Sequence, residues 1–78
     1  MELKLAFGET LKSLRLEKGF TQEKLAELCN LDVSFISMLE NGKRQPTLST
    51  IFSISKALEI KASFIVNKVD NIVNDVPE

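Results

Sequence analysis

A tight turn around Asn30 joins two short helical patterns, and this arrangement limits the fold more than any other part of the chain. Apolar residues at helical spacing predict one helix over residues 22–29 and a second over residues 33–40. Thr21 is expected to cap the first helix and Asp32 the second, because a short side-chain oxygen accepts hydrogen bonds from the free N–H groups of an opening turn. The turn needs a residue with positive φ, which asparagine tolerates better than most residues. The sequence therefore predicts two helices that cross at a steep angle.

The second of these helices carries an uncharged stripe on the face opposite its apolar positions Ile36 and Leu39. Members of the stripe recur at helical spacing, and most of them are small. The stripe consists of Val33, Ser34, Ser37, Met38 and Asn41. The first helix instead carries charged residues at Glu23, Lys24 and Glu27. A short helix with an uncharged face is suited to the major groove of DNA.

A resemblance to a known family rests on residues 21–46, which read TQEKLAELCNLDVSFISMLENGKRQP. This segment closely resembles the helix-turn-helix of the Cro/CI-repressor (XRE) family of small DNA-binding regulators. The shared features are Thr-Gln at the start of the first helix, Ile36-Ser37 in the second, the Leu-Glu-Asn-Gly-Lys at its end, and Pro46. With the flanking helices, the resemblance covers residues 4–67. It implies an all-α fold, a compact five-helix lambda-repressor-like DNA-binding domain.

Three further helices are predicted around this motif, over residues 3–18, 48–58 and 61–76. Gly19 ends the first of them, and Thr47 caps the second. The start of the third departs from the family pattern, because Lys61 stands where Ser, Thr or Pro is usual. Ser63 is an alternative cap for this helix.

The last predicted helix carries more apolar surface than a five-helix domain of this size can bury. Its apolar side chains are Phe64, Ile65, Val66, Val69, Ile72 and Val73. Because a large exposed apolar patch usually marks an interface, residues 61–76 are expected to form a symmetric homodimer. The alternative is a helix that folds back wholly onto its own core.

Length and composition indicate a single domain over residues 1–78 and exclude several kinds of site. The single cysteine excludes an intramolecular disulfide, and Cys29 falls at an apolar helix position, where we expect a small buried hydrophobe. The absence of histidine excludes a histidine-based metal site or general base. No cofactor, metal or small-molecule ligand is expected. No apolar run is long enough for a secretory signal or a membrane span, so a cytoplasmic protein is expected.

The charge of the chain argues against a strongly basic nucleic-acid binder. The net charge is −1, and residues 1–44 carry seven basic and seven acidic residues. DNA binding must therefore depend on a few well-placed cations and helix ends. Phosphate contacts are expected from Gln22, Asn41, Lys43 and Arg44, and base contacts from Val33, Ser34, Ser37 and Met38. Of these, Gln22 and Asn41 match family positions that contact the DNA backbone or brace the motif.

Two side chains near the motif have more than one interpretation. The resemblance implies that Arg15 and Glu40 form a structural ion pair that holds the helix over residues 3–18 against the helix over residues 33–40. On spacing alone, a solvated cation is the alternative for Arg15. Phe35 can pack against the helix over residues 48–58 or the turn, or its ring can contact the DNA backbone.

These observations predict a homodimeric transcriptional regulator that binds double-stranded DNA at a near-palindromic operator. Among family subgroups, the length and the closing apolar helix resemble controller proteins of restriction–modification systems. The alternative is a protein-interaction module, an antitoxin or anti-repressor, that uses its C-terminal helix to bind a protein partner. An enzyme is not expected, because the sequence offers no nucleophile–base pair and no metal cluster.

Overall fold

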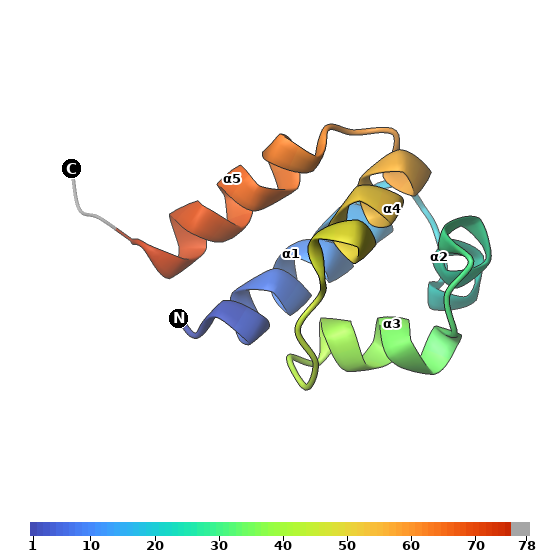
Figure 1. The fold of residues 1–78 in the computed structure, drawn as a ribbon, viewed down its shortest axis with the longest axis horizontal. Coiled ribbons are helices and arrows are strands. Elements are labelled where there is room, and N and C mark those ends of the chain that lie inside the picture. The colour runs from blue at the N-terminus through green and yellow to red at the C-terminus, as the bar shows by residue number, and fades with distance from the viewer. Residues whose placement is uncertain (76–78) are drawn as a thin grey trace.

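Five helices make up the part of the chain that the computed structural model describes, residues 1–75 (Figure 1). They are α1 (Leu3–Glu17), α2 (Gln22–Cys29), α3 (Val33–Glu40), α4 (Leu48–Leu58) and α5 (Ala62–Val73). α1 packs against α3 and α5, α2 packs against α3 and α4, and α4 packs against α5. No strand occurs within residues 1–75, and the predicted all-α class is confirmed. None of the helices in this described part has the length and hydropathy needed to cross a bilayer.

Side-chain hydrogen bonds cap two of the five helices, α2 and α4. The Thr21 hydroxyl oxygen accepts a hydrogen bond from the Lys24 N–H at 3.0 Å, and the Thr47 hydroxyl caps α4 in the same way. Asn30 has φ 56°, so it takes the left-handed conformation predicted for the turn between α2 and α3. The predicted cap by the Asp32 side chain is wrong. That side chain is exposed, and water can hydrate both the carboxylate and the opening N–H groups.

The ends of two helices differ from the prediction. α1 ends at Glu17, one residue earlier than expected. α5 begins at Ala62 and ends at Val73, and neither Lys61 nor Ser63 caps it with a side chain. The apolar repeat continues past this end, but the backbone of Asn74 is no longer helical, with φ −105° and ψ 62°. Its side-chain amide donates a hydrogen bond to the Asp70 carboxylate. The predicted end at residue 76 lies outside the described residues.

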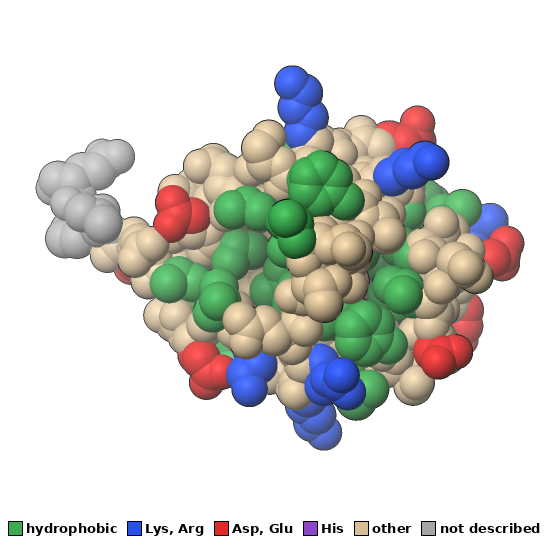
Figure 2. Space-filling model, in the orientation of Figure 1, with side chains coloured by type: hydrophobic (Ala, Val, Ile, Leu, Met, Phe, Trp, Pro, Cys, Tyr) green, Lys and Arg blue, Asp and Glu red, His purple; other side chains and the backbone are tan. Residues whose placement is uncertain are grey.

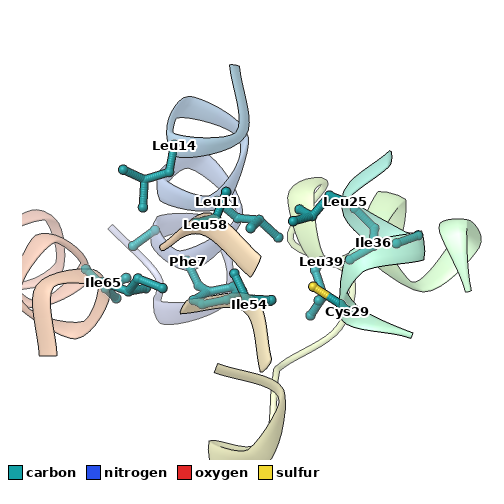
Figure 3. Packing of buried hydrophobic residues seen from close by; sticks show 13 residues of the cluster. Phe7, Leu11, Leu14, Leu25, Cys29, Ile36, Leu39, Ile54, Leu58 and Ile65 are labelled. Carbon is teal, nitrogen blue, oxygen red and sulfur yellow. The ribbon is translucent and has the colours of Figure 1, made fainter. Parts of the chain in front are cut away.

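The core forms where the apolar faces of all five helices meet (Figure 3). Its largest fully buried side chains are Leu11, Leu25, Ile36, Leu39, Ile54, Leu58 and Ile65. Burial of each such side chain contributes about 1.5–3 kcal/mol. Cys29 belongs to the same cluster, as predicted, and burial raises the pKa of its thiol.

Gly8 allows α1 and α3 to approach each other very closely. A Cβ atom at this position would lie 2.5 Å from the carbonyl oxygen of Leu39 and 2.6 Å from that of Glu40. These distances are shorter than van der Waals contact, so the packing requires glycine. This contact brings the backbone of α1 directly against the C-terminal end of α3.

Candidate nucleic-acid interface

α3 is held by one face and exposes the other. Ile36 and Leu39 are fully buried in the core, and Glu40 is buried beside them. The predicted base-reading side chains lie on the opposite face, where Val33 and Ser34 are exposed and Ser37 and Met38 are half-exposed. The structure therefore brings the predicted stripe together on one accessible helix face. DNA contact by these side chains stays a prediction.

Arg15 joins α1 to the end of α3 and to the turn before α2. Its Nε donates to Glu40 Oε2 at 2.6 Å, and its Nη2 donates to Glu40 Oε1 at 3.0 Å. Its Nη1 donates to the backbone carbonyl of Phe20 at 2.8 Å. The two side chains are 9% and 2% exposed, so the pair is buried. The hydrogen bond to Glu40 raises the pKa of Arg15 above its already high ordinary value, which keeps the guanidinium charged.

Gln22 and Asn41 both use their side-chain amides within the protein. Gln22 Nε2 donates to Glu40 Oε1 at 3.1 Å, which ties the first residue of α2 to the last residue of α3. Asn41 Nδ2 lies 3.4 Å from Ser37 Oγ, at the edge of hydrogen-bond distance. The Gln22 amide therefore braces the motif, one of the two roles that the family resemblance implied, whereas the exposed Asn41 contact stays within the last turn of α3.

The loop after α3 presents two cations beside the exposed face of that helix. Gly42 has φ 71° and lies against the side chain of Leu5 on α1. The Lys43 N–H donates to the Met38 carbonyl at 2.9 Å, which closes the helix end. Lys43 and Arg44 are both exposed. Figure 2 shows basic side chains along the lower edge of the molecule, where α3 and this loop lie in Figure 1.

The predicted dimer residues on α5 do not share one surface. Ile65 and Val69 are 1% and 7% exposed, because they pack into the core of their own chain. Their assignment to an exposed interface is therefore wrong. Phe64 and Val66 are 46% and 47% exposed, but they lie on opposite flanks of α5 because each residue of a helix turns by about 100°. Ile72 and Val73 are half-buried, so the free apolar surface of α5 is narrower than the sequence suggested.

Val66 borders an apolar hollow between α1, α4 and α5. The hollow is lined by Leu3, Phe7, Gln45, Pro46, Ile51, Ile65, Val66 and Val69. Figure 2 shows hydrophobic side chains gathered over this part of the molecule. Phe64 borders a different hollow and lies beside Lys68, whose Nζ is 5.2 Å from the centre of its ring. The flank that carries Val66 is therefore the more continuous apolar face.

Sequence reasoning missed several residues that build this site. Gly8, Leu5 and the Phe20 carbonyl position α3 and its flanking loop. A glycine within a helical pattern is a signal of close packing, and Gly8 could have been found in this way. The sequence placed Leu3 in α1 without a role at the surface, although it extends the apolar face of α5. No group of three cysteine or acidic side chains within residues 1–75 is placed to hold a metal ion.

Comparison with known proteins agrees with this geometry. The helix-turn-helix family profile matches residues 11–65, which is most of the chain. The chain belongs to the XRE-type helix-turn-helix family. This XRE-type protein is accordingly a DNA-binding transcriptional regulator, and the resemblance found in the sequence is confirmed.

Control proteins of restriction–modification systems are among the relatives of this XRE-type regulator. It is 37% identical over 70 residues to the control protein C.MunI of Mycoplasma sp, which covers 88% of this chain and 95% of that protein. The restriction–modification controller protein C.AhdI from Aeromonas hydrophila has a TM-score of 0.78 at 37% identity, and the match covers 80% of this chain and 94% of that chain. The wild-type controller protein C.Esp1396I has a TM-score of 0.84 at 32% identity, covering 97% and 99%.

Proposed function

We propose that this regulator binds a near-palindromic DNA operator as a homodimer. The observation that carries the proposal is the exposed, uncharged face of α3, whose opposite face is buried in the core. Base contacts come from Val33, Ser34, Ser37 and Met38, and phosphate contacts come from Gln22, Asn41, Lys43 and Arg44. The base-reading side chains offer few hydrogen-bonding groups, so DNA shape and bendability supply part of the specificity.

The charge distribution explains why two copies are needed. The net charge is −1, so no general basic field attracts DNA. One protomer offers only two exposed cations at the end of α3, Lys43 and Arg44. A twofold dimer doubles these contacts and presents two α3 helices about 34–36 Å apart, one turn of DNA. Such a pair selects half-sites related by the same symmetry.

The dimer forms through α5, along the flank that carries Val66 and Val73. Leu3 and the apolar hollow beside it extend this flank toward α1 and α4. Exposure of this apolar face to water is unfavourable in a monomer. A second copy that covers the face removes this cost. Phe64 lies on the other flank of α5, where its ring is next to Lys68.

The likeness to C.MunI, C.AhdI and C.Esp1396I supports a more specific role. C.AhdI and C.Esp1396I are restriction–modification controller proteins, and C.MunI is a control protein. We propose the same role for this chain, with regulation by its own concentration. A dimer that forms only above a threshold concentration gives such a regulator a delayed response.

Selection from a random duplex pool at near-physiological salt tests the operator. Enrichment of a near-palindrome with half-sites about 10 base pairs apart, centre to centre, is expected. If folded and dimeric protein enriches no sequence, the regulator proposal is wrong. The search would then turn to a protein partner for α5, as an antitoxin or anti-repressor would have.

Two matched substitutions on α5 test the dimer face. Val66→Lys places a charge on the proposed face, and Phe64→Lys places the same charge on the opposite flank. Both positions are about half-exposed, so each variant should fold. Analytical ultracentrifugation should show that Val66→Lys is monomeric and that Phe64→Lys is dimeric. The reverse result would move the interface to the Phe64 flank.

A further inference from the structure

Arg44 lies beside an aromatic ring at the edge of α3. Its guanidinium carbon is 5.7 Å from the centre of the Phe35 ring, within the range of a cation–π contact. Arg44 is exposed, and the structure gives its side chain no hydrogen bond or ion pair with any residue in the range 1–75. Within residues 1–75, the Phe35 ring is therefore the group that favours one position for this cation.

Phe35 is a firm support for this contact. It is half-buried in α3 and packs against the hydrophobic core, so the position of its ring is set by the fold. The loop that carries Arg44 is fixed at its start by Gly42 against Leu5 and by the Lys43 N–H bond to Met38. The ring and the start of the loop thus hold Arg44 from two sides.

The contact leaves the chemistry of Arg44 free for a ligand. A cation–π interaction acts on the positive charge of the guanidinium group. Unlike an ion pair, it leaves the five N–H donors free to form hydrogen bonds. Arginine normally loses much rotamer freedom when it binds, and a side chain that is already held loses less. A pre-positioned guanidinium with unused donors matches the geometry of a phosphate group.

We propose that Phe35 is a positioning residue for DNA binding, which orients Arg44 toward a backbone phosphate next to the groove that α3 enters. The inference rests on the proposed function and adds a residue that is in neither the base-contact nor the phosphate-contact set. Phe35 acts through Arg44. Lys43 is the natural comparison, because no aromatic ring lies beside its ammonium group in the described part of the chain.

A double-mutant cycle on binding to a random-sequence duplex tests the proposal, since a phosphate contact acts on all sequences alike. Phe35→Leu should weaken binding about two- to fivefold per protomer, which is the energy of an exposed cation–π contact converted to an equilibrium ratio. The same substitution should have little further effect in an Arg44→Gln background. In a Lys43→Gln background it should have its full effect, and Phe35→Tyr should restore wild-type binding.

The salt dependence separates positioning from simple packing. Arg44→Gln should reduce the slope of log affinity against log salt by about 0.9 per protomer, and Phe35→Leu should reduce it in part. Equal effects of Phe35→Leu in the Arg44→Gln and Lys43→Gln backgrounds would overturn the inference and leave the proposed function intact. Wild-type protein that binds no duplex would overturn both.

A measurement on the free protein keeps the test decisive if Phe35→Leu folds poorly. In the wild-type NMR spectrum, the ring current of Phe35 should shift the Arg44 side-chain methylene protons away from their random-coil positions. Random-coil shifts for these protons would remove the contact, and the inference would fall regardless of the DNA measurements.

Discussion

Replacing only one member of the buried Arg15–Glu40 pair should greatly lower the free energy of unfolding. Replacing both members with apolar residues should lower it much less. Glu40→Leu takes away two of the three hydrogen bonds of the Arg15 guanidinium and leaves only the one to the Phe20 carbonyl. The charge then stays in a site where its side chain is 9% exposed. Breaking a buried pair in this way costs about 3–5 kcal/mol. The whole domain is stabilised by about 4–12 kcal/mol, from about 0.05–0.15 kcal/mol per residue.

Urea and thermal unfolding, followed by circular dichroism, measure this effect. Glu40→Leu should lower Tm by more than about 10 °C, since 1 kcal/mol corresponds to about 4–8 °C in a domain of this size. Arg15→Met combined with Glu40→Leu should recover most of that loss, because two apolar side chains need no partners. The exposed pair Lys24–Glu27, with its atoms 3.9 Å apart, is the control, and Lys24→Met should change Tm little. A double variant no more stable than Glu40→Leu would refute the reasoning.

Four further outcomes are expected. Gly8→Ala should lower the free energy of unfolding by about 1–3 kcal/mol through overpacking, and a urea titration that shows stabilisation, as helix propensity alone predicts, would contradict this. Glu59→Gly should raise Tm, because Glu59 has φ 57°, a conformation that costs a non-glycine residue about 1–2 kcal/mol; an unchanged Tm would count against strain there. Lys43→Ala should weaken all duplexes alike and reduce the salt slope by about 0.9 per protomer, and an unchanged slope would remove it from the phosphate contacts. Because burial raises the pKa of Cys29, the folded state favours the protonated thiol, and stability should fall as pH rises above the unfolded thiol value of about 8.5 toward the higher folded pKa. Thermal melts of Cys29→Ala should lack this component, and an identical alkaline decline in both proteins would argue against it.

Local chemistry was the part of the structure that the sequence predicted well. The caps by Thr21 and Thr47 and the left-handed Asn30 each depend on neighbours a few residues away. The Asp32 cap failed although the residue type was favourable, since its exposed carboxylate makes no hydrogen bond to the opening turn of α3. Glu59 closes α4 in the left-handed conformation without being glycine or asparagine, and no propensity rule indicated it.

Contacts between helices distant in the sequence were harder to predict. The pairing of Arg15 with Glu40 came only from the family resemblance, because 25 residues separate the two. The close approach at Gly8 depends on where α3 crosses α1. The apolar pattern of α5 correctly indicated a helix, but the pattern alone could not say that Ile65 would serve the core and Val66 the surface. That division is set by the position of α1 and α4 around α5.

The two faces of α3 perform separate tasks, and this separation affects how the protein can evolve. Ile36, Leu39 and Glu40 hold the helix in place, while Ser34 and Met38 lie outside the core cluster. Substitutions on the outer face can therefore accumulate without unfolding the domain, since surface changes usually alter stability by less than about 0.5 kcal/mol. New operator preferences are accessible in single steps from a scaffold that stays unchanged. In a combinatorial library of substitutions at the outer positions, nearly every variant should therefore fold.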